Sequence, residues 1–178
     1  EDLIRLRGSA DAVALKLKHH DEALHVRRAP DEPEAKLVYD AIEQSRVEAL
    51  GAQRYPGLAL NVANAVELRL KTEGYGRSSC REEIPLAEAL RVVARNVFLK
   101  TADTCPPATR HVGDLWQNSV IQKAGDSLQK MAACLSNQKE FTKHLRTFLH
   151  ALDLSQAPME DEQETAQSEQ QSQGSGQE

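Results

Sequence analysis

The chain has 178 residues, with 22 Lys or Arg residues against 27 Asp or Glu residues and a formal net charge of −5. Six of the acidic residues lie in 155–178, which has no Lys or Arg, so 1–154 is nearly neutral. This body lacks the basic surface that nucleic-acid binding requires, and no apolar run approaches the ~20 residues of a membrane-spanning helix. Three widely spaced cysteines without a CxxC pair indicate reduced thiols rather than zinc or redox sites. We therefore expect a cytoplasmic protein that binds neither nucleic acid nor a membrane.

Apolar residues recur at helical spacing along 1–154, whereas alternating strand-type runs are absent. This pattern predicts an all-α fold, a single domain of about six or seven helices. A first helix is expected to reach Pro30, and a second to run from near Pro33 to a break at Tyr55-Pro56-Gly57, where a third begins. The apolar stripes of these three helices are Leu3, Leu6, Val13, Leu17 and Leu24; Leu37, Val38, Ala41, Ile42, Ala49 and Leu50; and Leu58, Val62, Ala65, Val66 and Leu70.

Two loops are predicted in the second half of the body. Residues 73–83 are rich in glycine and serine, but their spacing matches neither GxGxxG nor a P-loop, so an interhelix loop is expected rather than a nucleotide site. Residues 101–113 contain Pro106-Pro107 and form the second predicted loop.

Three further helical stretches flank these loops. One starts near Pro85, and another starts near Leu115 and is interrupted or ended at Gly125. Asn137, followed three residues later by Glu140, has the shape of a capping box and predicts the start of the last helix. Their apolar stripes are Leu86, Leu90, Val93, Val97 and Phe98; Leu115, Trp116, Val120 and Ile121; and Phe141, Leu145, Phe148, Leu149 and Leu152.

The two ends of the chain suggest a piece of a longer protein. The chain begins at Glu1 without a methionine, and its first residues already have helical spacing. Residues 155–178 lack aromatic residues and almost lack aliphatic ones, so they cannot bury enough surface to offset chain entropy. We expect this acidic, Gln- and Ser-rich segment to be a disordered linker after a helical domain at 1–154.

A cluster of histidines near the end of the first predicted helix raises the question of a metal site. On one continuous helix Asp21 and His25 share a face and could hold one ion, whereas His20 and His25 could do so only across a break. Two ligands are too few, since a closed zinc site needs four and a catalytic one three. The alternative is a polar helix end in which His19, His20 and His25 interact favourably with the helix dipole.

A second group of charged residues lies on the second predicted helix. Glu43 and Arg46 are neighbours at i, i+3, while Glu48 lies off that line. The pair could be an exposed ion pair worth a few tenths of a kcal/mol. Alternatively, Arg46 could reach another helix or a partner protein, where its rigid fork suits carboxylates. Spacing leaves both interpretations open.

These two groups carry a resemblance to a known family. The stretches "LKLKHHDEALHVRRAP" at 15–30 and "VYDAIEQSRVEALGA" at 38–52 resemble the amino-terminal region of the CobT family, the T subunits of aerobic, ATP-dependent cobaltochelatase. "IPLAEALRVVAR" at 84–95 and the spacing from Trp116 to Lys123-Ala124-Gly125 are also similar. Two features depart from the family pattern. No DxSxS motif of the family's von Willebrand A-type domain occurs in the chain, and Tyr55-Pro56-Gly57 leaves the length of the second helix open.

The resemblance implies a function that the residues alone do not. Members of this family belong to a complex that inserts Co²⁺ into hydrogenobyrinic acid a,c-diamide with hydrolysis of ATP, in cobalamin biosynthesis. The resemblance implies a non-catalytic adaptor domain in a hetero-oligomer with two partners, an AAA+ ATPase subunit and a large tetrapyrrole-binding subunit. Under this interpretation the chain itself holds no cofactor, and the complex uses ATP, Mg²⁺ and Co²⁺.

Seven residues of the two motifs are the candidate partner-binding residues. If they meet a partner, Arg46→Ala should weaken the complex without unfolding the domain. The alternative function is a cobalt-binding metallochaperone domain in which Asp21 and His25 are the metal-ligand candidates. The seven candidates are His19, His20, Asp21, His25, Glu43, Arg46 and Glu48.

Overall fold

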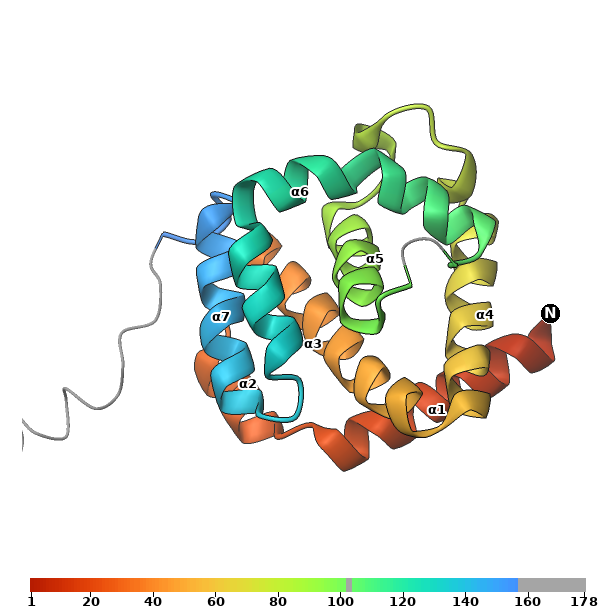
Figure 1. Ribbon diagram of the computed structural model, residues 1–178, viewed down its shortest axis with the longest axis horizontal. Helices are drawn as coiled ribbons and strands as arrows, with labels where there is room; N and C mark the ends of the chain where they lie inside the picture. The colour runs from red at the N-terminus through yellow and green to blue at the C-terminus, as the bar shows by residue number, and fades with distance from the viewer. Residues whose placement is uncertain (102–103, 157–178) are drawn as a thin grey trace, which may run out of the picture.

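The computed structural model describes residues 1–101 and 104–156, which form seven α-helices and two short 3-10 turns without a strand (Figure 1). The predicted all-α class is therefore confirmed. The predicted disordered linker lies, from residue 157 onward, outside the described residues. Among the helices described, none has both the length and the apolar character needed to cross a bilayer. The elements are α1 (Asp2–His19), α2 (Glu22–Arg28), α3 (Pro33–Arg54), α4 (Pro56–Thr72), the turns η1 (Tyr75–Arg77) and η2 (Arg81–Glu83), α5 (Leu86–Leu99), α6 (Pro107–Ala133) and α7 (Gln138–Ala151).

Helix α5 is the central element and packs against α3 and α6 (Figure 1). Leu90 and Phe98 of α5 belong to an apolar cluster with α3, the second half of α6 and α7. Ala89 and Val92 of the same helix belong to a second cluster with α4 and the first half of α6. Helix α1 packs against the outer side of α3 and α4, and α2 contacts α7. The central helix thus joins two halves of the core.

Local signals set most of the helix boundaries. Pro56 lies in the first turn of α4, where its missing N–H costs nothing, and Tyr55 before it takes an extended conformation that ends α3. The predicted break at Tyr55-Pro56-Gly57 is confirmed. Asn137 caps α7, because its side chain accepts a hydrogen bond from the N–H of Glu140 at 3.2 Å. The predicted start of the last helix is confirmed as well.

Two predicted boundaries are wrong. Helix α6 begins at Pro107, inside the predicted 101–113 loop, because a proline in the first turn starts a helix as readily as it marks a loop. The first predicted helix is two helices with a break at His20-Asp21. Asp21 causes a new start there, since its side chain accepts a hydrogen bond from the N–H of Leu24 at 3.0 Å. The predicted interruption at Gly125 is present as a kink one residue earlier, at Ala124.

Helix α1 turns a different face to the core from the one its leucine spacing suggested. Gly8 and Leu15 are buried, whereas Leu6 and Leu17 are 67% and 83% exposed. A Cβ on Gly8 would overlap the Cβ of Ala65, so glycine lets α1 lie close against α4. Of the other stripes, the predicted core positions Leu37 and Ile121 are also exposed.

The described chain remains packed just past the predicted domain boundary at residue 154. The ring Nδ1 of His150 lies 3.0 Å from the carbonyl oxygen of Ser155, which is buried. The backbone N–H of Gln156 donates to Glu32 Oε1 at 3.0 Å. These contacts join the end of α7 to the start of α3.

The start of α6 is held by a carboxylate from another helix. Glu67 of α4 accepts hydrogen bonds from the backbone N–H groups of Ala108 and Thr109, each at 3.0 Å, and from the Thr109 hydroxyl at 3.1 Å. These N–H groups have no partner within the helix, and an anion at a helix N-terminus is favoured by the dipole. Burial alone would raise the pKa of Glu67, but these bonds and Lys71 outweigh it and the pKa is lowered.

Replacing Glu67 with glutamine is therefore expected to lower the free energy of unfolding by about 1–2 kcal/mol at neutral pH. Because the folded-state pKa lies below the ordinary 4.5, the stabilisation is present above that pH and is lost as the pH falls through the folded-state pKa. Urea unfolding followed by circular dichroism at several pH values measures the difference between the two proteins. A difference that stayed constant down to pH 3 would contradict this account. Glu73→Gln, an exposed change near the end of the same helix, is the control.

Candidate functional site

Arg46 is the centre of a buried polar network that joins α3 to two other parts of the chain. Its side chain is 1% exposed and forms a two-point ion pair with Glu43, with Nε–Oε2 and Nη2–Oε1 distances of 2.8 and 2.7 Å. Its Nη1 donates to the carbonyl oxygen of Leu135 at 2.7 Å, and its Nη2 donates to that of His19 at 2.6 Å. The i, i+3 pairing that spacing predicted is confirmed. Of the two interpretations left open, the exposed pair is wrong, and Arg46 does reach other helices.

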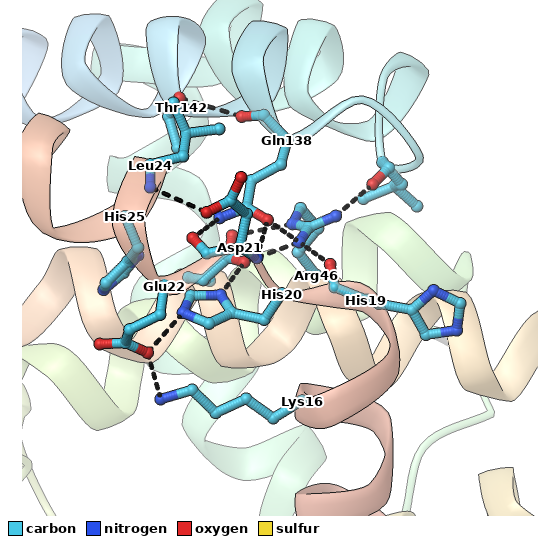
Figure 2. A network of polar contacts seen from close by, with 12 residues as sticks. Lys16, His19, His20, Asp21, Glu22, Leu24, His25, Arg46, Gln138 and Thr142 are labelled. Atoms are coloured by element: carbon cyan, nitrogen blue, oxygen red, sulfur yellow. Dashed lines mark hydrogen bonds and ion pairs between the residues drawn. The ribbon is translucent and has the colours of Figure 1, made fainter.

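Gln138 at the start of α7 completes this network, and sequence reasoning missed it. Its Oε1 accepts from Arg46 Nη2 at 3.0 Å and from the backbone N–H of Asp21 at 2.8 Å. Its Nε2 donates to the carbonyl oxygen of Asp21 at 3.0 Å. Figure 2 shows the amide of Gln138 directed at the break between α1 and α2. The only available signal was its place directly after the Asn137 cap, which fixes the orientation of the first turn of α7.

His20 extends the network toward the surface. Its side chain is 3% exposed, with Nδ1 2.7 Å from Glu43 Oε1 and Nε2 3.1 Å from Glu22 Oε2. Glu22 in turn lies 3.6 Å from the ammonium group of Lys16 (Figure 2). Each ring nitrogen of His20 thus lies next to a carboxylate oxygen. Glu43 also pairs with Arg46 and Glu22 with Lys16, so these contacts form one continuous chain from Arg46 to Lys16.

His25 lies beside His20, with ring centroids 4.7 Å apart, because the chain breaks between them. Helical spacing predicted that these two rings could meet only across a break in the helix. That break is present between the end of α1 and the start of α2. His25 Nε2 is 2.8 Å from Asp40 Oδ1, while its buried Nδ1 has no hydrogen-bond partner among the described residues. Asp21 is engaged as the cap of α2. Within 1–101 and 104–156, no group of three or more His, Cys, Asp or Glu side chains has an arrangement that could hold a metal ion.

His19 contributes its backbone rather than its ring to the network. The carbonyl oxygen of His19 accepts from Arg46, and Figure 2 shows the imidazole directed away from the other polar groups. Burial, together with the nearby charges of Lys18, Arg46 and Arg54, lowers the pKa of His19. The ring is therefore neutral at physiological pH and partly accessible.

Glu48 belongs to a second buried network, which joins α3 to α5. The side chain is 1% exposed and accepts from Arg91 Nη2 at 2.6 Å, from Arg95 Nη1 at 3.0 Å and from Gln44 Nε2 at 3.0 Å. Burial lowers the pKa of Arg95, and Glu48 opposes that effect. Sequence reasoning missed both arginines, which lie in the "IPLAEALRVVAR" stretch at 84–95.

The structure thus brings six of the seven candidates together and places Glu48 apart. Glu43, Arg46 and Glu48 are buried, and their polar atoms bind other residues inside the domain. Glu43 pairs with Arg46, and Glu48 accepts from Arg95. Direct contact of these residues with a partner stays a prediction, but their observed role is to hold helices together. We therefore no longer expect Arg46→Ala to leave the domain unaffected, and instead expect the substitution to destabilise the fold.

A stripe of apolar side chains lies exposed on the outer face of α1. Its members are separated by three, four, three and four residues, the spacing of the seam in a helical bundle. Gly8 and Leu15, which pack against α4 and α3, lie on the opposite face of the helix. Helix α1 therefore has one apolar face for the fold and another that no described residue covers. The exposed stripe, called the α1 stripe below, consists of Leu3, Leu6, Ala10, Val13 and Leu17.

Comparison with known proteins places these features in a family. No solved structure matches the chain. The family model described as "Cobalamin biosynthesis protein CobT" matches residues 1–178, the whole chain. The resemblance expected from the His/Asp and Glu/Arg motifs is confirmed. The chain, with its all-α domain built around Arg46, belongs to the CobT family of cobalamin biosynthesis proteins.

Proposed function

We propose that this domain is a non-catalytic adaptor in a cobaltochelatase complex, and that the α1 stripe is its contact with the AAA+ ATPase subunit. The observation that supports this most is the exposed apolar face of α1 in a member of the CobT family. Large apolar patches on a protein surface mark interaction sites more often than accidental exposure. The chemistry of metal insertion and ATP hydrolysis would then reside in the other subunits, which use ATP, Mg²⁺ and Co²⁺.

The spacing of the α1 stripe indicates a helical partner. Residues repeated at alternating steps of three and four keep one face along a neighbouring helix, with each side chain entering a gap between four others. From Leu3 to Leu17 the stripe extends over about 21 Å at the rise of an α-helix. This length accommodates about two heptads of a partner helix, enough to dock on a folded domain.

Charged side chains beside the α1 stripe indicate which charges a partner helix would carry next to its own apolar seam. Arg7 and Lys16 flank the seam on either side, while Asp2 lies at its amino end. A partner helix with acidic residues next to its apolar seam would complement the two basic positions. The large tetrapyrrole-binding subunit would contact another surface of the hetero-oligomer.

Charge introduced into the α1 stripe is expected to separate binding from folding. The double variant Leu6→Asp/Leu17→Asp should bind the purified AAA+ subunit at least about 100-fold more weakly, because two apolar contacts of hot-spot size are lost. Both side chains are exposed, so the unfolding midpoint should change no more than it does for an ordinary surface substitution. Isothermal titration calorimetry measures the affinity, and circular dichroism checks the fold.

Leu37→Asp/Leu60→Asp is the matched control, since both leucines are similarly exposed but lie on α3 and α4. This control should retain wild-type affinity. Equal affinity of the stripe variant and the control would contradict the assignment of the contact to α1. Failure of the wild-type chain to bind the AAA+ subunit at all would contradict the adaptor function itself.

A cobalt-carrying function is the second candidate, supported by the adjacent rings of His20 and His25 and by the unpartnered Nδ1 of His25. Co²⁺ would be cargo delivered to the complex. Lys16 and Lys36 line the same cleft of about 370 Å³, together with the carboxylates of Glu22, Asp40 and Glu43. Calorimetric titration with cobalt chloride of the wild type and of His25→Ala tests this function. Binding that the substitution abolishes would favour it over the adaptor, and a silent wild-type titration would remove it.

A further inference from the structure

A second cleft, of about 330 Å³, lies beside the contact between α1 and α4 and is lined by arginines from three helices. Arg5 comes from α1, Arg69 from the last turn of α4, and Arg91 from α5. The close approach of α1 to α4 at Gly8 brings Arg5 to this position, where its Nη2 donates to the Thr72 hydroxyl at 3.2 Å. The three arginines therefore line one cleft although they are far apart in the sequence.

Two of these arginines have an Nε–H group without an acceptor. Arg69 Nε and Arg91 Nε are buried and make no hydrogen bond with any described residue. Arg69 Nη2 forms an ion pair with Glu88 Oε2 at 2.7 Å. Burial, followed by the like charge of Arg91, lowers the pKa of Arg69. Two guanidinium donors at the cleft thus lack an acceptor among the described residues.

The carboxylates near the cleft leave these two Nε–H groups without an acceptor. Glu48 at its inner end accepts from Arg91 and also from Arg95 behind it, so one carboxylate is shared by two cations. Glu73 lines the outer end but is exposed to solvent, which screens its charge. An unpaired buried donor is costly, and an anion entering the cleft would offer the missing acceptors.

We propose that this cleft, formed by Arg5, Arg69 and Arg91, binds the phosphoryl oxyanion of a phosphate or polyphosphate. Guanidinium groups bind carboxylates and phosphates alike through paired N–H groups. A planar carboxylate suits one fork, whereas a phosphoryl group directs three or four oxygens outward and can accept from several sides. Arginines from α1, α4 and α5 line the cleft, so more than one guanidinium group can donate to a single ion, and this favours the tetrahedral one. The volume admits a chain of phosphoryl groups as well as a single one.

Titration of the full chain with inorganic phosphate at constant ionic strength tests the proposal. The expected result is saturable binding, detected by shifts of the arginine Nε–H signals in NMR spectra and by a rise in thermal stability with phosphate concentration. Arg69→Gln should weaken binding by at least about tenfold, because it removes a charge-assisted donor set. Arg5→Gln changes an exposed residue, should leave the fold intact, and should weaken binding severalfold. Pyrophosphate binding more tightly than phosphate would identify a polyphosphate ligand, whereas equal affinities would identify a single phosphoryl group.

Arg7→Gln is the matched control, since Arg7 is an exposed arginine of the same helix that does not line the cleft. It should keep the wild-type affinity for phosphate. The proposal would be overturned by a titration that does not saturate, by an equal response to sodium acetate, or by equal weakening in Arg7→Gln and Arg69→Gln.

Discussion

Replacing Arg46 with alanine is expected to lower the free energy of unfolding by about 3–5 kcal/mol, the range for breaking a buried ion pair by removing one partner. The substitution leaves the buried carboxyl group of Glu43 with His20 as its one remaining polar partner among the described residues. It also leaves the carbonyl oxygens of Leu135 and His19 without their donor. A domain of this size is stable by about 5–15 kcal/mol. Such a loss would therefore raise the fraction of unfolded molecules strongly at physiological temperature.

Urea unfolding followed by circular dichroism measures this loss, and Arg46→Lys tests its cause. Lysine keeps the charge but places its donors on a single nitrogen, whereas Arg46 uses three nitrogens to reach four groups. An intermediate loss is therefore expected for Arg46→Lys. Arg7→Ala, an exposed change on α1, should alter stability by no more than about 0.5 kcal/mol. A similarly small effect of Arg46→Ala would show that the network contributes little to stability.

The Arg46 network shows which contacts spacing along the sequence can predict. Glu43 and Arg46 lie three residues apart on one helix, so their pairing follows from helical geometry alone. Gln138 lies 92 positions from Arg46, and only the packing of α7 against α3 brings them together. Whether the pair is exposed or buried depends on the same packing, so spacing had to leave both interpretations open. Asn137 and Pro56 were predictable because a cap and a proline act within a few residues.

Helix α1 shows what spacing along the sequence cannot predict, namely which face of a helix is buried. Its leucine spacing predicted a helix correctly, because periodicity is a property of the segment itself. The choice of buried face is not such a property, since it depends on what the neighbouring helices offer. Gly8 fits against Ala65, and a Cβ on Gly51 of α3 would overlap Leu15, so small residues decide which side packs. The face with the larger apolar residues remains exposed, and for that reason we assign it to a partner.

Replacing Glu48 with alanine is expected to cost about 3–5 kcal/mol as well, through a different mechanism from Arg46→Ala. Glu48 is the shared acceptor of Arg91 and Arg95, and its removal leaves two cations on α5 that repel each other. Arg95 is 5% exposed, so water cannot replace the lost carboxylate there. Because the pair joins α3 to the central helix, the loss should appear as a lower midpoint of the whole unfolding transition in urea, not as local fraying.

Two further variants separate the charge of Glu48 from its shape. Glu48→Gln keeps the volume and one acceptor oxygen, so it should lose less stability than Glu48→Ala. Glu48→Leu/Arg95→Leu removes one carboxylate and one cation together, and replacing both members of a buried pair with apolar residues is often neutral. The double variant should therefore be more stable than Glu48→Ala, although it changes more atoms. If it were less stable, the packing around Glu48, rather than the two unpaired arginines, would account for the loss.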